Sequence, residues 1–112
     1  MGTEGALAEL EQEAMLAILE LTEKAYAPAI ARALEQSSGR GISRGALYMA
    51  LDRLQRMGLL RWHLEGPTAE RGGYPRRRFE ITGAGVEALR LEWETPLHLR
   101  ARLKEILARE ER

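Results

Sequence analysis

The feature that most constrains this chain is a segment, residues 43–60, that carries the start and the stop of a helix and then turns into a strand. Ser43 suits the N-cap position, because its hydroxyl accepts a hydrogen bond from the first turn of a helix. Gly58 suits the left-handed residue that ends a helix. Between them, apolar residues recur at steps of three and four. We therefore predict a helix over residues 43–57 whose buried stripe is formed by Leu47, Leu51 and Leu54.

Two segments of alternating polarity follow this helix, and they read as the strands of a β-hairpin. The first covers residues 60–65, and the second covers residues 76–82 with Phe79 and Ile81 facing inward. Glycine and proline between the two segments are typical of turns. The hairpin should therefore have a long, basic, glycine-containing tip, and the inward face of its first strand should be formed by Leu60, Trp62 and Leu64.

Three further helices complete the predicted fold. Residues 4–22 and 26–37 each have one apolar face, and residues 37–41 read as the loop that follows. Thr82 can cap a fourth helix, which we expect to be kinked or broken near Pro96.

The order is helix, helix, helix, strand, strand, helix. This order is typical of a winged helix-turn-helix, a mainly α fold in which the antiparallel hairpin is the wing. On this interpretation residues 1–82 form the DNA-binding domain of one compact chain, and residues 83–112 form a C-terminal dimerisation helix.

The net charge of zero hides a strong asymmetry along the chain. Residues 1–39 carry seven acids and two bases, residues 40–78 carry nine arginines and three acids, and residues 79–112 carry seven acids and six bases. The middle third therefore has a net charge of +6, as expected of a surface that binds a phosphate backbone. The alternative is a solvated charged face with no partner.

A helix that enters the major groove reads base edges mainly with its N-terminal residues, and a wing reaches the adjacent backbone or minor groove. Counting 100° per residue from the buried stripe gives the outward positions of the helix. Tyr48 can instead belong to the core, and Arg53 can simply solvate the helix. The candidate DNA-binding residues are Ser43, Arg44, Gly45, Tyr48, Met49, Arg53, Arg71, Tyr74, Arg76 and Arg77.

Residues 43–60, SRGALYMALDRLQRMGLL, resemble the recognition helix of PadR-type transcription regulators, and GGYPRRRFEIT resembles the wing of that family. The resemblance covers about residues 12–91. Arg78 departs from it, because an aromatic residue is usual there. The matching positions include Ala46, Leu47, Tyr48, Leu51, Arg53, Leu54, Gly58, Leu59, Leu60, Gly72, Gly73, Pro75, Arg76, Ile81 and Thr82.

The resemblance implies a homodimer that binds a palindromic operator, commonly as a repressor and sometimes relieved by a small aromatic effector. It also implies that the first and last helices make the dimer interface. An apolar stripe on a terminal helix independently favours a partner chain. Trp93 is the candidate stacking surface for an effector. The candidate interface residues are Leu7, Leu10, Leu89, Trp93, Leu99, Leu103 and Ile106.

Several classes of function are not indicated. The chain has no cysteine and only two histidines, so we expect no metal site and no cofactor, and a reducing cytoplasm fits this composition. No apolar run is long enough to span a membrane, and no export signal is evident. No nucleophile and base stand at a spacing that indicates an enzyme. The remaining alternative is a winged helix that binds another protein and no DNA.

Overall fold

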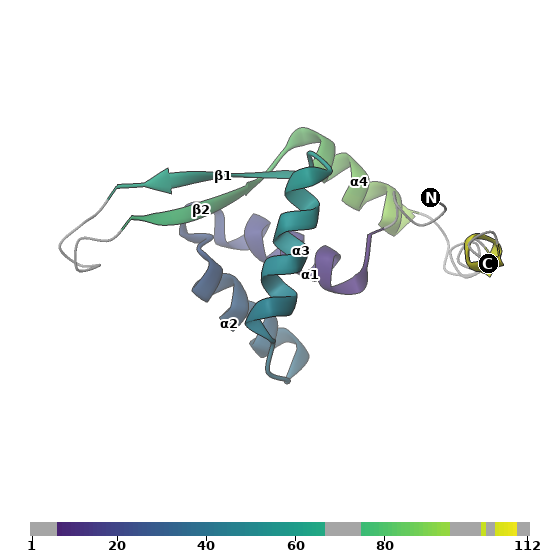
Figure 1. The fold of residues 1–112 in the computed structure, drawn as a ribbon, viewed down its shortest axis with the longest axis horizontal. Coiled ribbons are helices and arrows are strands. Elements are labelled where there is room, and N and C mark those ends of the chain that lie inside the picture. The colour runs from purple at the N-terminus through teal and green to yellow at the C-terminus, as the bar shows by residue number, and fades with distance from the viewer. Residues whose placement is uncertain (1–6, 67–74, 95–101, 103–104, 110–112) are drawn as a thin grey trace.

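The structure is a computed structural model that describes residues 7–66, 75–94, 102 and 105–109. The elements follow the predicted order of three helices, two strands and a helix, with a short 3-10 turn after the first helix. In Figure 1 the hairpin extends away from the helices at one end, and the helical residues 105–109 lie at the other end. The elements are α1 (Glu9–Leu21), η1 (Thr22–Lys24), α2 (Ala27–Ser38), α3 (Arg44–Arg56), β1 (Leu60–Glu65), β2 (Arg76–Ile81) and α4 (Gly83–Glu94).

Both ends of α3 form as predicted. The Ser43 hydroxyl accepts a hydrogen bond from the Ala46 N–H over 3.3 Å. Gly58 has a φ of +76°, and the Leu59 N–H donates to the Leu54 carbonyl over 2.9 Å. This pair of features is the Schellman ending, in which a left-handed residue lets the chain turn back on the last carbonyls. The turn leads directly into β1, so the end of α3 determines where the hairpin begins.

The hairpin is a two-stranded antiparallel sheet in which Leu60 lies opposite Ile81 and Glu65 lies opposite Arg76. The segment just before α2 also pairs with β2, through a single antiparallel bridge between Tyr26 and Arg78. The Phe79 N–H donates to the Ala25 carbonyl beside this bridge, over 2.8 Å. The base of the wing is therefore attached to the start of α2, while its far end projects from the helices (Figure 1).

One apolar core joins all the elements. Its largest fully buried side chains are Met15, Ile18, Ile30, Leu47 and Leu54. Leu7 and Leu89 belong to the same core and are only 6% and 5% exposed. Both were predicted as dimer-interface residues, and their burial within the single chain leaves little of either side chain for a partner. Leu10 is half-buried against this core.

The boundary after α2 differs from the prediction. Ser37 and Ser38 are helical rather than part of a loop, and Gly39, with a φ of +73°, ends the helix. Two serines gave a loop signal, but the left-handed glycine decides the ending, because an L side chain rarely adopts that conformation. Pro28 stands in the first turn of α2, as expected. The predicted kink or break near Pro96 lies outside the described residues.

The start of α4 is attached to the turn between α3 and β1. The Thr82 hydroxyl accepts from the Gly85 N–H over 3.0 Å and donates to the Gly58 carbonyl over 2.8 Å. A Cβ added to Gly85 would lie 2.1 Å from the Leu59 carbonyl oxygen. Only glycine permits this approach, so Gly85 sets how closely α4 packs beneath the base of the wing.

Candidate nucleic-acid interface

The outward face of α3 is open to solvent. Arg44 and Gly45 are exposed, and the exposed fractions of Tyr48 and Met49 are 46% and 74%. Tyr48 is therefore largely a surface residue, and the alternative that it belongs mostly to the core is wrong. Ser43 is occupied as the N-cap of the helix. The helix therefore presents guanidinium, hydroxyl and thioether groups on one side while its leucines fill the core.

Four of the seven described arginines between residues 44 and 78 are paired with carboxylates, which reduces the charge that the sequence suggested. The shortest nitrogen–oxygen distances are 2.5 Å for Arg53–Glu11, 3.3 Å for Arg56–Asp52, 2.7 Å for Arg61–Glu80 and 2.8 Å for Arg78–Glu65. Within the described part of this segment, only Arg44, Arg76 and Arg77 have no carboxylate partner. Together with the exposed Arg40, these three side chains carry the positive charge that the described part of residues 40–78 leaves available to an anionic ligand.

Arg53 was expected to contact DNA, and in the structure its side chain is engaged within the fold. Its guanidinium group reaches back to α1 and pairs with Glu11, which is 4% exposed. The sequence did hold a signal for this pairing. Glu11 stands four residues after Leu7 and three before Ala14, inside the apolar stripe of α1, where a carboxylate needs a cationic partner.

Arg76 and Arg77 lie on aromatic rings on opposite faces of the hairpin. The Arg76 guanidinium carbon is 3.5 Å from the centroid of the Tyr26 ring, and that of Arg77 is 4.6 Å from the centroid of the Trp62 ring. Successive residues of a strand point to opposite faces, so two neighbouring arginines cannot share one side of the wing. Sequence reasoning treated them as equivalent, whereas the fold separates them.

Two polar clusters lie along one face of the hairpin. The Tyr26 hydroxyl donates to Glu65 over 2.5 Å, and Glu65 also accepts from Arg78, which raises the pKa of that guanidinium. On the same face, hydrogen bonds from His63 and then from Arg61 lower the pKa of Glu80 to about 2. Glu80 is therefore ionised at any physiological pH.

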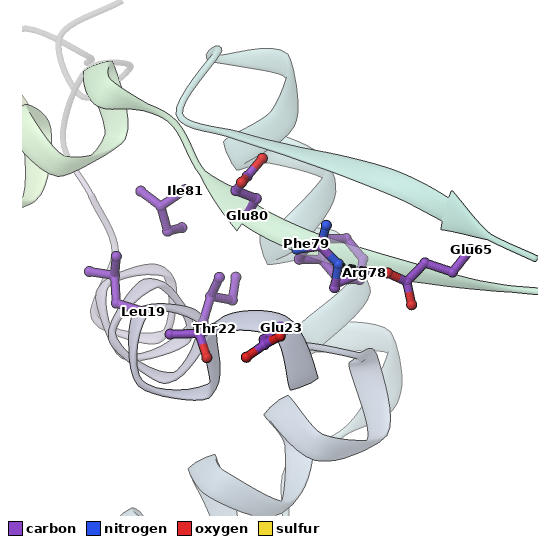
Figure 2. A pocket seen from close by; sticks show the side chains of 9 residues that line it. Leu19, Thr22, Glu23, Glu65, Arg78, Phe79, Glu80 and Ile81 are labelled. Carbon is purple, nitrogen blue, oxygen red and sulfur yellow. Dashed lines mark hydrogen bonds and ion pairs between the residues drawn. The ribbon is translucent and has the colours of Figure 1, made fainter.

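A hollow of about 550 Å³ lies between the end of α1 and β2. Figure 2 shows Leu19, Thr22 and Glu23 on the helical side, and on the hairpin side the residues Glu65, Arg78, Phe79, Glu80 and Ile81. Of its three carboxylates, Glu65 and Glu80 are paired with arginines. Trp93, the predicted effector residue, is not part of its lining.

The remaining predicted residues divide into two groups. Trp93 and Ile106 are 56% and 40% exposed, so both side chains offer apolar surface to solvent in the single chain. Arg71 and Tyr74 at the tip of the wing, and Leu99 and Leu103 of the C-terminal segment, lie outside the described residues. In the part of the chain that the structure describes, no group of three or more His, Asp or Glu side chains could hold a metal ion. The same part contains no helix that is long and apolar enough to cross a membrane.

The three-helix core, the capped α3 and the attached hairpin together define a winged helix-turn-helix domain. Residues 15–91 match the Transcriptional regulator PadR-like family, and the chain belongs to that family. It is therefore a transcriptional regulator rather than an enzyme. No curated protein sequence matches the chain.

Three solved structures share this fold. A protein from Thermoplasma acidophilum, named as a transcriptional regulator, has a TM-score of 0.62 at 16% identity, covering 86% of this chain and 89% of its own. A PadR-like transcriptional regulator from Bacillus cereus has a TM-score of 0.57 at 22% identity, covering 85% and 89%. A PadR family transcriptional regulator from Eggerthella lenta has a TM-score of 0.54 at 24% identity, covering 86% and 84%. At these identities the likeness establishes the fold.

Proposed function

We propose that this chain is a cytoplasmic, homodimeric repressor that binds a palindromic operator in double-stranded DNA. The observation that carries the proposal is the set of unpaired arginines, Arg44 on α3 and Arg77 on the wing, beside the exposed side chains of Tyr48 and Met49. Every other arginine of α3 and β1 is neutralised by a carboxylate. Positive charge is thus left at the positions from which a winged helix meets a duplex.

In this proposal α3 enters the major groove with its N-terminus leading. Arg44 makes a forked contact with guanine, and Met49 contacts a thymine methyl group. Gly45 lets the backbone come close, and Tyr48 donates to a phosphate. Arg76 and Arg77, with Arg71 and Tyr74 nearer the tip, contact the flanking backbone or minor groove.

Residues 1–82 bind DNA in this proposal, and residues 83–112 pair the two protomers. Support comes from apolar side chains that the single chain leaves in solvent, with Val86 46%, Trp93 56% and Ile106 40% exposed. Val86 and Trp93 are seven residues apart and so share one face of α4. A dimer built this way would read two half-sites about 34–36 Å apart, or a multiple of that distance.

An aromatic effector that stacks on Trp93 is also part of the proposal. A Trp62→Phe variant leaves Trp93 as the single tryptophan, since the chain has two. We expect its fluorescence to be quenched by at least one member of a panel of planar aromatic compounds, and DNA to be released by the same compound. Unchanged fluorescence across the panel would remove the effector from the proposal.

The experiment that tests DNA binding is selection of bound fragments from sheared genomic DNA by the purified protein, followed by a mobility-shift titration at several salt concentrations. We expect a selected palindrome to bind more tightly than random duplex, and the affinity to fall steeply with salt as counterions are released. A matched Arg44→Ala, Arg77→Ala variant should lose the shift while keeping its melting temperature. If no fragment binds better than random duplex at moderate salt, the proposed function is wrong and a protein partner becomes the better reading.

A further inference from the structure

Trp62 on β1 contacts both elements of the candidate interface. Its indole Nε1 donates to the Gln55 side-chain oxygen on α3 over 3.0 Å, and its ring lies under the Arg77 guanidinium group of β2. The hydrogen bond fixes the ring against the helix, and the ring in turn limits where the arginine can lie. One side chain thus connects α3 to β2 of the wing.

The contact with the Trp62 ring leaves the N–H donors of Arg77 available. A guanidinium group that stacks through its flat face keeps its N–H donors in the plane, where they remain available to oxygen acceptors. Within the described residues Arg77 has no carboxylate partner, in contrast to Arg61 and Arg78 of the same hairpin. Arg77 is therefore held in place without being neutralised.

Arg77 lies beside exposed residues of α3. A hollow of about 260 Å³ between α3 and the hairpin is lined by side chains from both, including Tyr48, Met49, Gln55, Trp62 and Arg77. Arg76 lies on the other face of the hairpin, over Tyr26. Of the two hairpin arginines that have no carboxylate partner in the described residues, only Arg77 borders the same hollow as the reading face of α3.

We infer that Trp62 is a positioning residue for DNA binding, which holds the Arg77 guanidinium at a fixed place relative to α3 so that wing and helix engage one duplex in a single register. The inference rests on the proposed function. An arginine free to move would lose rotamer entropy on reaching a phosphate, whereas an arginine already stacked has lost part of it before binding. Trp62 therefore contributes to affinity without touching DNA.

The test is a double-mutant cycle of Trp62→Leu and Arg77→Ala, measured as operator affinity over a range of salt. Arg77→Ala should weaken binding about tenfold and reduce the slope of log K against log salt by about 0.9. Trp62→Leu should weaken binding about two- to fivefold. In the Arg77→Ala background, Trp62→Leu should have no further effect, because its action passes through Arg77. Trp62→Phe, which keeps a ring, should restore most of the affinity.

A merely structural role for Trp62 predicts a different pattern. In that case Trp62→Leu would lower the melting temperature and weaken binding by the same factor with and without Arg77, and this result would overturn the inference. Gln55→Leu on the exposed side of α3 is a second variant for the same test, because it removes the hydrogen bond to the Trp62 indole but keeps the ring. It should also weaken binding only when Arg77 is present. The Arg61→Ala variant of the opposite face is the control and should change neither slope nor affinity. If the unsubstituted protein bound no DNA, the proposed function would fall and this inference with it, whereas independent effects would overturn the inference alone.

Discussion

The Arg53 guanidinium group on α3 donates to the Glu11 carboxylate on α1 over 2.5 Å, and the same carboxylate oxygen accepts the Ala8 N–H over 2.9 Å. Glu11 therefore closes the first turn of α1 and ties that helix to α3 at once. Since α3 carries the candidate reading face, this pair helps to set the angle at which the face is presented. It stabilises the scaffold, and it engages the Arg53 side chain within the fold.

Loss of Arg53 should be costly because it leaves a buried carboxylate without its cation. We expect Arg53→Ala to lower the free energy of unfolding by about 2–3 kcal/mol. The measurement is urea denaturation followed by circular dichroism. The control is Asp52→Ala, which breaks an exposed pair and should cost no more than about 0.5 kcal/mol. A joint Glu11→Leu, Arg53→Leu variant should recover most of the loss; if it were less stable than Arg53→Ala, the unpaired charge would not be the cause.

Gly85 should not tolerate a methyl group. An added Cβ would meet the Leu59 carbonyl oxygen and the Ile81 side chain at 2.1 and 2.7 Å, so α4 would have to move away from the base of the wing. We expect Gly85→Ala to destabilise the protein by about 2–3 kcal/mol in a thermal or urea melt. Gly83→Ala is the matched control, since nothing lies within 4 Å of an added Cβ there. Similar melting temperatures for the two variants would contradict the close packing of α4.

Glu80 should make the stability of the wing depend on acid pH. Hydrogen bonds from His63 and Arg61 lower the pKa of Glu80 from its ordinary 4.5 to about 2. A carboxylate with a depressed pKa stabilises the fold fully above about pH 4.5, and this contribution is lost as the pH falls toward 2. The Glu80→Gln variant should therefore show a flatter loss of stability over that range than the unsubstituted protein. Glu20→Gln, an exposed change on α1, is the control and should follow the original profile.

Arg44 and Arg77 should differ in what they contribute to DNA binding. An arginine at the N-terminus of the reading helix contacts base edges, so Arg44→Ala should reduce the preference for operator over random duplex by about tenfold. Arg77→Ala, through loss of a phosphate contact, should weaken both duplexes nearly equally. Competition titrations with the two duplexes measure the ratio. A sequence-selective loss in Arg77→Ala, or an unchanged ratio in Arg44→Ala, would reverse these assignments.

Local features of the sequence were reliable wherever neighbouring residues decide the structure. The cap at Ser43, the left-handed Gly58 and the positions of the two strands are all short-range effects, and they were predicted correctly. Leu64 was predicted to face inward with Leu60 and Trp62, but its side chain is 63% exposed. The end of α2 was misplaced by one residue, because Ser37 and Ser38 suit either a loop or a last helical turn and Gly39 decides between them.

Residue roles that depend on partners distant in the sequence were harder to predict from the sequence. Leu7 and Leu89 had the apolar character of either a core or an interface, and only the packing of α1 against α4 assigned them to the core. The packing role of Gly85 likewise depends on a distant residue, because no local pattern reveals the carbonyl that approaches it from residue 59.

The sequence by itself determined the class of fold, the place of α3 and the wing in it, and the cationic character of residues 40–78, because periodicity, caps and charge are written in neighbouring residues. The tertiary structure decided which of those charges remain available. Arg53, Arg61 and Arg78 were paired by carboxylates that folding brought to them, and Arg76 and Arg77 were separated by the pleat of one strand. Coulomb attraction and stacking act over a few ångströms, so they follow distances in space rather than distances along the chain.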